Sequence, residues 1–137
     1  MTTKIKSKGT ALQMTVAAAY VTIGQVISLD GPSMESETYE SDTLDNASAG
    51  IPYSETGRTE GGSVSGELFF DPVDTYHLAM LALLTTPASM AYNMLFADAA
   101  TTDWAFTGVG LQFGPKVALA DGLKASFSVK LSGIPTF

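Results

Sequence analysis

Few residues in this chain could perform chemistry, and their spacing argues against catalysis. His77 is the only histidine and there is no cysteine, so a metal site would lack further nitrogen or sulfur ligands. A lone histidine is more often a packing or interface residue. Glu35 and Glu37 would share one face of a strand, the minimum arrangement for paired carboxylates. They lie within a general acid excess, which is typical of a solvated surface.

Three glycines come close to the spacing of a dinucleotide-binding loop. They are Gly108, Gly110 and Gly114, but the third lies one position late, and Pro115 follows where a helix should begin. We expect these glycines to mark bulges or close packing within a strand. The sequence therefore predicts a non-enzymatic protein with no cofactor and no metal site.

Composition and charge limit the class of protein. Of the 137 residues, 45% are hydrophobic and 15% are charged, which is typical of a chain that folds rather than remaining disordered. This length favours a single domain over residues 1–137. Seven basic and fourteen acidic residues give a net charge of −7, the wrong sign for a protein that grips DNA by releasing counterions. The absence of cysteine excludes a disulfide framework.

The first residues superficially resemble a secretory signal, because Lys4, Lys6 and Lys8 precede the partly apolar run 11–23. Polar residues interrupt this run, and its apolar side chains alternate with the period of a strand. The alternating residues are Leu12, Met14, Val16, Val21 and Ile23. We expect an N-terminal strand here, and no stretch elsewhere reaches the ~18 apolar residues that a membrane span requires.

Period-two alternation dominates the remaining chain and predicts a mainly β fold. Residues 123–131 place apolar side chains on one face and Lys or Ser on the other, as expected for a strand with one buried face. Residues 63–70 follow the same design, and further strands are predicted at 90–97 and 104–113. We expect a β-sandwich or barrel-like subunit with one flanking helix.

The flanking helix is predicted at about residues 72–84. Asp71 can cap its N-terminus and Pro72 can occupy its first position, while Pro87 ends it. Residues 78–84 are apolar almost all round, so the helix should be covered on more than one side. We expect Leu81 and Leu84 to pack against the sheet or against a neighbouring subunit.

The segment from Asp30 to Asp74 holds eleven of the fourteen acids and one base, Arg58. Within it, residues 34–44 alternate without any face that is apolar throughout, so they cannot form an ordinary strand with one buried face. Such a strand suits the wall of a water-filled channel or a junction between subunits. Residues 45–62 follow as a predicted loop of about eighteen residues, long enough to be functional or disordered.

The order of these segments resembles the major tail tube proteins of long-tailed bacteriophages. The resemblance covers the chain from about residue 12 onward and consists of order and local texture. A polar strand ends in Thr43-Leu44-Asp45-Asn46, and after the loop Gly61-Gly62-Ser63-Val64-Ser65-Gly66-Glu67-Leu68-Phe69-Phe70-Asp71-Pro72 leads into the helix. The ending Lys124 to Pro135, an alternating strand that closes in Ser132-Gly133-Ile134-Pro135, looks like that family's C-terminal strand.

The resemblance implies a structural subunit of the virion tail, assembled in the host cytoplasm into stacked hexameric rings. Inner strands would line a conduit for double-stranded DNA, which passes without specific binding, and the long loop would contact the neighbouring ring. Partners would be the chain itself and the tape-measure, distal tail and tail terminator proteins. Candidate lumen-facing acids are Glu35, Glu37, Glu40, Asp42 and Glu67. Candidate inter-ring residues are Asp45, Asn46, Tyr53, Glu55, Arg58 and Glu60.

Two alternatives remain open from the sequence. One is a monomeric β-sandwich or barrel-like module that holds a small apolar ligand among Met90, Tyr92, Met94 and Phe96, although these residues also suit a core. The other is a related tube protein of a contractile tail, a gene-transfer particle or a type VI secretion system. Oligomeric state separates the first alternative from a tube subunit, because a ligand-binding module should stay monomeric.

Overall fold

The computed structural model describes residues 3–16, 18–120 and 122–137, and these are mainly β. In chain order the elements are β1 (Ala11–Val16), β2 (Ala19–Thr22), β3 (Val26–Asp30), β4 (Glu35–Glu40), β5 (Tyr53–Glu60), β6 (Ser63–Phe69), α1 (Thr75–Thr85), β7 (Met90–Leu95), β8 (Asp103–Lys116) and β9 (Lys124–Leu131). The prediction of a mainly β subunit with one helix is confirmed. β3 was not predicted.

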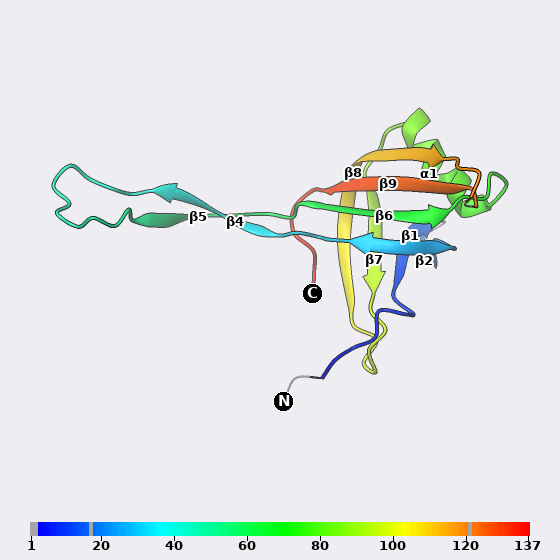
Figure 1. The fold of residues 1–137 in the computed structure, drawn as a ribbon, viewed down its shortest axis with the longest axis horizontal. Coiled ribbons are helices and arrows are strands. Elements are labelled where there is room, and N and C mark those ends of the chain that lie inside the picture. The colour runs from blue at the N-terminus through cyan, green and yellow to red at the C-terminus, as the bar shows by residue number, and fades with distance from the viewer. Residues whose placement is uncertain (1–2, 17, 121) are drawn as a thin grey trace.

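Seven strands form one antiparallel sheet in the order β2-β1-β7-β8-β9-β6-β3. The sheet curls because β8 bends: its register with β9 shifts between Val109 and Gln112, and Gly110 there has a φ of 63°. Figure 1 shows the first half of β8 beside β7 and the second half, in a different direction, beside β9. One continuous sheet thus makes both walls of a barrel-like body.

The core lies inside this curl and follows the predicted alternation. Ala125, Phe127, Val129 and Leu131 of β9 are buried, as are apolar residues of β1, β6, β7 and α1. The prediction for Gly108 is also confirmed: a Cβ there would lie 2.3 Å from the Val129 side chain. Close packing therefore requires Gly108, and the bulge uses Gly110.

The remaining glycine of that trio and the N-terminal run have separate outcomes. Gly114 has neither a positive φ nor a close neighbour, so close packing does not explain it. The N-terminal run forms the hairpin of β1 and β2, with Leu12 and Met14 buried. The predicted N-terminal strand is therefore confirmed.

The helix begins three residues later than predicted, and Asp71 is not its cap. The Asp74 carboxylate accepts hydrogen bonds from the backbone N–H groups of Tyr76 (2.9 Å) and His77 (3.1 Å). Asp71 instead accepts from the Val73 N–H in a turn that contains Pro72. The backbone N–H of Asp71 donates to His77 Nδ1 at 3.1 Å, so a tertiary contact holds Asp71 outside the helix.

The prediction of a loop over residues 45–62 is wrong for its second half. Residues 53–60 form β5, which pairs with β4, while residues 41–52 connect the two strands. β5 was missed because it has no apolar face, and hydrophobic alternation is the usual indicator of a strand. β4 also lacks an apolar face but lies within the polar strand predicted at residues 34–44. Gly57, with a φ of 85°, also lowers the strand propensity of β5.

Candidate assembly surfaces

The hairpin of β4 and β5, with the loop between them, forms an arm of residues 35–60. It makes a two-stranded sheet of its own and extends away from the body (Figure 1). None of residues 35–60, all of which the structure describes, is buried. Large apolar side chains are nevertheless exposed on it, namely Tyr39, Leu44, Ile51 and Tyr53. The arm thus carries apolar surface without a core.

Polar contacts hold the arm in shape. The Arg58 guanidinium donates two hydrogen bonds of 2.8 Å to the Glu37 carboxylate, across the register shift between Ser36 and Thr38. This pairing lowers the pKa of Glu37 and raises that of Arg58. In the connecting loop, Thr43 donates to Asp45 at 2.5 Å, and this hydrogen bond lowers the pKa of Asp45.

Because Glu37 stays ionised beside Arg58, it is poorly suited to act as a general acid, which needs a raised pKa. Glu35 and Glu37 are therefore better interpreted as part of the arm's surface than as a catalytic pair. An isolated two-stranded hairpin is marginally stable in water. The arm therefore gains little stability from its own contacts.

Charge is divided very unevenly between the arm and the body. The arm holds seven acids and one arginine, so its formal charge is −6. The remaining residues hold seven acids and six lysines, so the body carries −1. Nearly all of the net charge of −7 therefore belongs to the arm.

The structure brings together the candidate inter-ring residues but not the candidate lumen-facing acids. All six inter-ring candidates lie on the arm. Glu35, Glu37, Glu40 and Asp42 also lie there, whereas Glu67 lies on β6 of the body. Glu67 accepts a hydrogen bond of 2.5 Å from Lys116 of β8, and this bond lowers the pKa of Glu67. The acids predicted from one stretch of sequence thus occupy two surfaces.

Glu67 belongs to a polar face that β3, β6, β9 and the second half of β8 share. A shallow depression of about 640 Å³ on this face has small polar side chains around it. They include Ser28, Ser65, Gln112, Ser126 and Ser128. Its polarity contrasts with the opposite face of the same strands, which forms the core.

The helix exposes part of its apolar surface at the end of the body opposite the arm (Figure 1). His77 and Met80 are buried, whereas Leu78 and Leu84 are 47% and 41% exposed and Leu81 is half-buried. The body's own sheet therefore covers one side of the helix, and the prediction that a neighbour covers the other remains a proposal.

His77 has a structural environment. Since its Nδ1 accepts from the Asp71 backbone N–H, its Nε2 carries the proton and donates to the Gly24 carbonyl oxygen at 3.1 Å. Both ring nitrogens are thus used in tying the helix to two turns. No cluster of three or more possible metal ligands occurs among the residues that the structure describes. In the same described ranges, no helix is both long and apolar enough to cross a bilayer.

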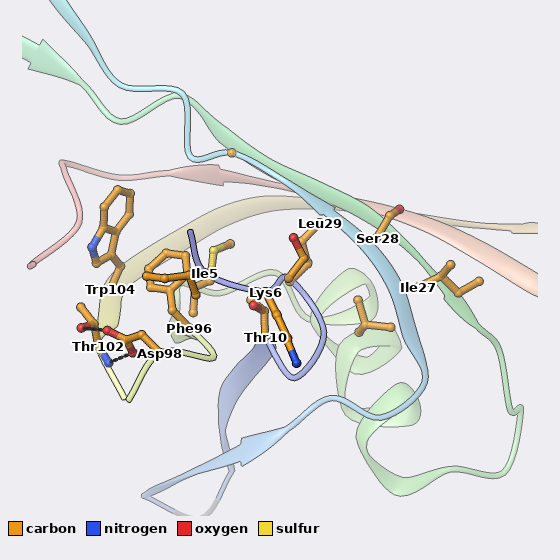
Figure 2. A pocket seen from close by; sticks show the side chains of 14 residues that line it. Ile5, Lys6, Thr10, Ile27, Ser28, Leu29, Phe96, Asp98, Thr102 and Trp104 are labelled. Atoms are coloured by element: carbon orange, nitrogen blue, oxygen red, sulfur yellow. Dashed lines mark hydrogen bonds between the residues drawn. The ribbon is translucent and has the colours of Figure 1, made fainter. Parts of the chain in front are cut away.

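The residues considered for a small apolar ligand divide between core and surface. Tyr92 is buried and stacks on Phe106 with ring centroids 5.6 Å apart. Met94 and Phe96 border an open groove of about 820 Å³ between the N-terminal segment, β3 and the turn after β7 (Figure 2). Sequence reasoning missed this groove because β3 forms one of its walls.

The fold of this chain is similar to two solved structures, although its sequence matches no known family. No protein-family model and no curated protein matches the sequence. A chain of the anti-feeding prophage (AFP) baseplate, in a 6-fold symmetrised cryo-EM structure, has a TM-score of 0.70 at 12% identity. The match covers 96% of this chain and 94% of that chain.

The SPP1 tail tube, solved by solid-state NMR and cryo-EM, gives a TM-score of 0.64 at 10% identity. This match covers 97% of this chain and 79% of that chain. The chain therefore has a phage tail tube-like fold, as the sequence resemblance implied. At these identities the likeness concerns the fold.

Proposed function

We propose that this chain is a structural subunit of a tail tube, which assembles in stacked hexameric rings to make a hollow conduit for DNA. The likeness to both a tail tube and a prophage baseplate supports a role in a tail or tail-like particle. The protein would then be located in the virion tail, and its partners would be other copies of itself and the remaining tail proteins. No enzymatic step is part of the proposal.

The observation that carries this proposal is the arm. A hairpin of 26 residues, 35–60, without one buried residue, gains little stability from its own contacts. It exposes four large apolar side chains, those of Tyr39, Leu44, Ile51 and Tyr53, and exposed apolar surface on an element without a core is typical of an interaction surface. A monomeric ligand-binding module has no use for such an element, whereas a polymer subunit can bury it against a neighbour.

The test is electron microscopy of the purified full chain beside an arm-less variant. Glu35 and Glu60 are paired across the base of the arm, so a short Gly-Asn-Gly turn can replace residues 35–60. We expect rings or tubes from the full chain, and a folded monomer from the variant. The apolar core lies entirely outside the arm, so thermal unfolding of the variant should resemble that of the unassembled full chain.

Hydrogen exchange provides a second measurement on the full chain. The amides of residues 41–60 should exchange quickly in the free subunit and slowly in the polymer, because a partner supplies the missing contacts. A full chain that stays monomeric at high concentration would contradict the proposed function. Normal tubes from the arm-less variant would show that the arm is not the assembly element.

A further inference from the structure

We propose that the arm of one subunit binds the groove and the basic N-terminal segment of another copy. This inference rests on the proposed function, because it names the surface that receives the arm. The N-terminal segment is defined here as residues 3–10. It forms one border of the groove described above.

The groove offers apolar surface in the form that the arm requires. Figure 2 shows Ile5 of the N-terminal segment close to Phe96 and Trp104, with Leu29 of β3 nearby. Ile5 is 58% exposed, so the groove is not closed by the subunit itself. The exposed Tyr and Leu side chains of an arm can fill such a groove and be removed from water.

The backbone beside the groove is also available. Within the described part of the chain, β3 is the last strand of the seven-stranded sheet and pairs with β6 alone. Its other edge presents N–H and C=O groups that an added strand can satisfy. A hairpin already holds its strands extended, so it loses less conformational entropy on such pairing than a flexible peptide would.

Charge complementarity selects the partner. Lys4, Lys6 and Lys8 are exposed, and they make up half of the body's six lysines. The two ion pairs among the described residues use Arg58 and Lys116 instead. The arm concentrates a formal charge of −6 in 26 residues, whereas the body outside the N-terminal segment carries seven acids and three lysines, a charge of −4, over a much longer part of the chain.

The acidic partner is another copy rather than the subunit's own arm. Figure 1 shows the arm extending away from the body, whereas the N-terminal segment lies beside the body. The arm therefore points away from its own groove. Opposite charges on separated surfaces of one chain speed and orient association between copies.

The first experiment reverses the charges. The triple variant K4E/K6E/K8E and the arm variant E40K/E55K/E60K should each raise the critical concentration for polymerisation, on the order of tenfold. These arm acids are exposed and make no hydrogen bond with another side chain among the described residues. The combined variant should polymerise better than either parent, because its reversed lysines and acids attract again.

The second experiment uses the absence of native cysteine. Subunits carrying Leu44→Cys at the arm tip are mixed with subunits carrying Ser7→Cys at the groove, and the polymer is treated with a short bismaleimide. We expect cross-linked dimers. Val117→Cys in place of Ser7→Cys is the matched control, because Val117 is 81% exposed on the body and does not line the groove.

The outcomes separate this inference from the proposed function. If the full chain forms tubes and the triple lysine variant forms them equally well, without cross-links at Ser7→Cys, the inference is overturned and the tube role stands. Equal cross-linking at Val117→Cys would also overturn it. If the lysine variant assembles normally but loses binding to a DNA duplex in a mobility-shift assay, the segment serves DNA and the inference fails.

Discussion

Single side chains in this subunit hold the body together where the sheet alone would leave it open. His77 links the helix to the Asp71 turn and to Gly24. Phe70 lies between His77 and Phe113, with ring centroids 5.9 Å and 5.3 Å away. His77, the residue considered for chemistry in the sequence, thus holds the helix against one end of the barrel-like body.

Burial raises the pKa of Tyr92 from 10.0 to about 12, so the stability of the folded chain should depend on this phenol at high pH. Below pH 10 the phenol is neutral in both the folded and the unfolded chain, so stability does not depend on it. Between pH 10 and 12 the unfolded chain releases this proton and the folded chain keeps it, so stability falls as pH rises. The loss by pH 12 should be on the order of 2 kcal/mol.

The measurement is urea unfolding of the wild type and Tyr92→Phe between pH 9 and 12. The two proteins differ in this one hydroxyl group, so the difference between the two curves isolates Tyr92. The variant should lose less stability than the wild type over this range. Parallel curves would mean that the ring is hydrated in solution.

At the scale of elements, the sequence predicted the strands that bury one face and the polar strand β4, but not β3 or β5. β9 and β6 alternate cleanly, and the apolar residues on their inner faces are buried, including Val64 and Leu68 of β6. β5 has no apolar face, so its pairing depends on Arg58, Glu37 and backbone hydrogen bonds that no hydrophobic period reveals. From the sequence, the arm could be recognised only as an acidic stretch. The pairing of β4 with β5 determines which of these acids lie on the arm and which lie on the body.

The helix start shows a second limit. Asp71 and Asp74 both satisfy the sequence preference for a cap, and Pro72 is compatible with either choice. The bond from the Asp71 N–H to His77 decides between them. Local preference alone does not contain that tertiary information.

The helix α1 has a buried side and an exposed side, which substitutions can test separately. Met80 is fully buried and Leu84 is 41% exposed, so the same aspartate substitution should act differently at the two positions. Met80→Asp buries an unpaired carboxylate and should unfold the subunit. Leu84→Asp should leave a folded monomer and reduce polymerisation, as expected if a neighbouring subunit covers this side of the helix.

Circular dichroism and sedimentation velocity of the two variants make this measurement. Leu81 is half-buried, so Leu81→Asp should fall between them. Wild-type polymerisation by Leu84→Asp would place this side of the helix at the outer surface of the tube. Unfolding by Leu84→Asp would show that the helix turns its exposed side inward in solution.

At the scale of the whole molecule, the separation of arm and body changes how an acidic subunit can serve a DNA conduit. An acidic wall would repel the duplex at about the 8 Å Debye length of physiological salt, whereas a basic wall would retain it by counterion release. Half of the fourteen acids are on the arm, where lysines of another copy would neutralise them under the proposed docking. The polar face containing Glu67 is then the better candidate for the wall.

That face predicts the effect of a single charge reversal. Glu67 is paired with Lys116, and Lys124 also lowers its pKa electrostatically, so Glu67→Lys would place three ammonium groups close together. All are exposed enough to be solvated, so assembly should persist. In virions carrying Glu67→Lys, DNA ejection followed by dye release should slow, most strongly at low ionic strength, because the new basic patch binds phosphate.

Glu67→Gln is the matched control, since it removes the acid without adding a base and should slow ejection less. Reversal of three arm acids, E40K/E55K/E60K, should instead impair assembly before any ejection can be measured. The two surfaces would then have separate roles, with the arm joining subunits and the polar face contacting the passing duplex. Wild-type ejection kinetics for Glu67→Lys at low salt would show that the polar face lies outside the conduit.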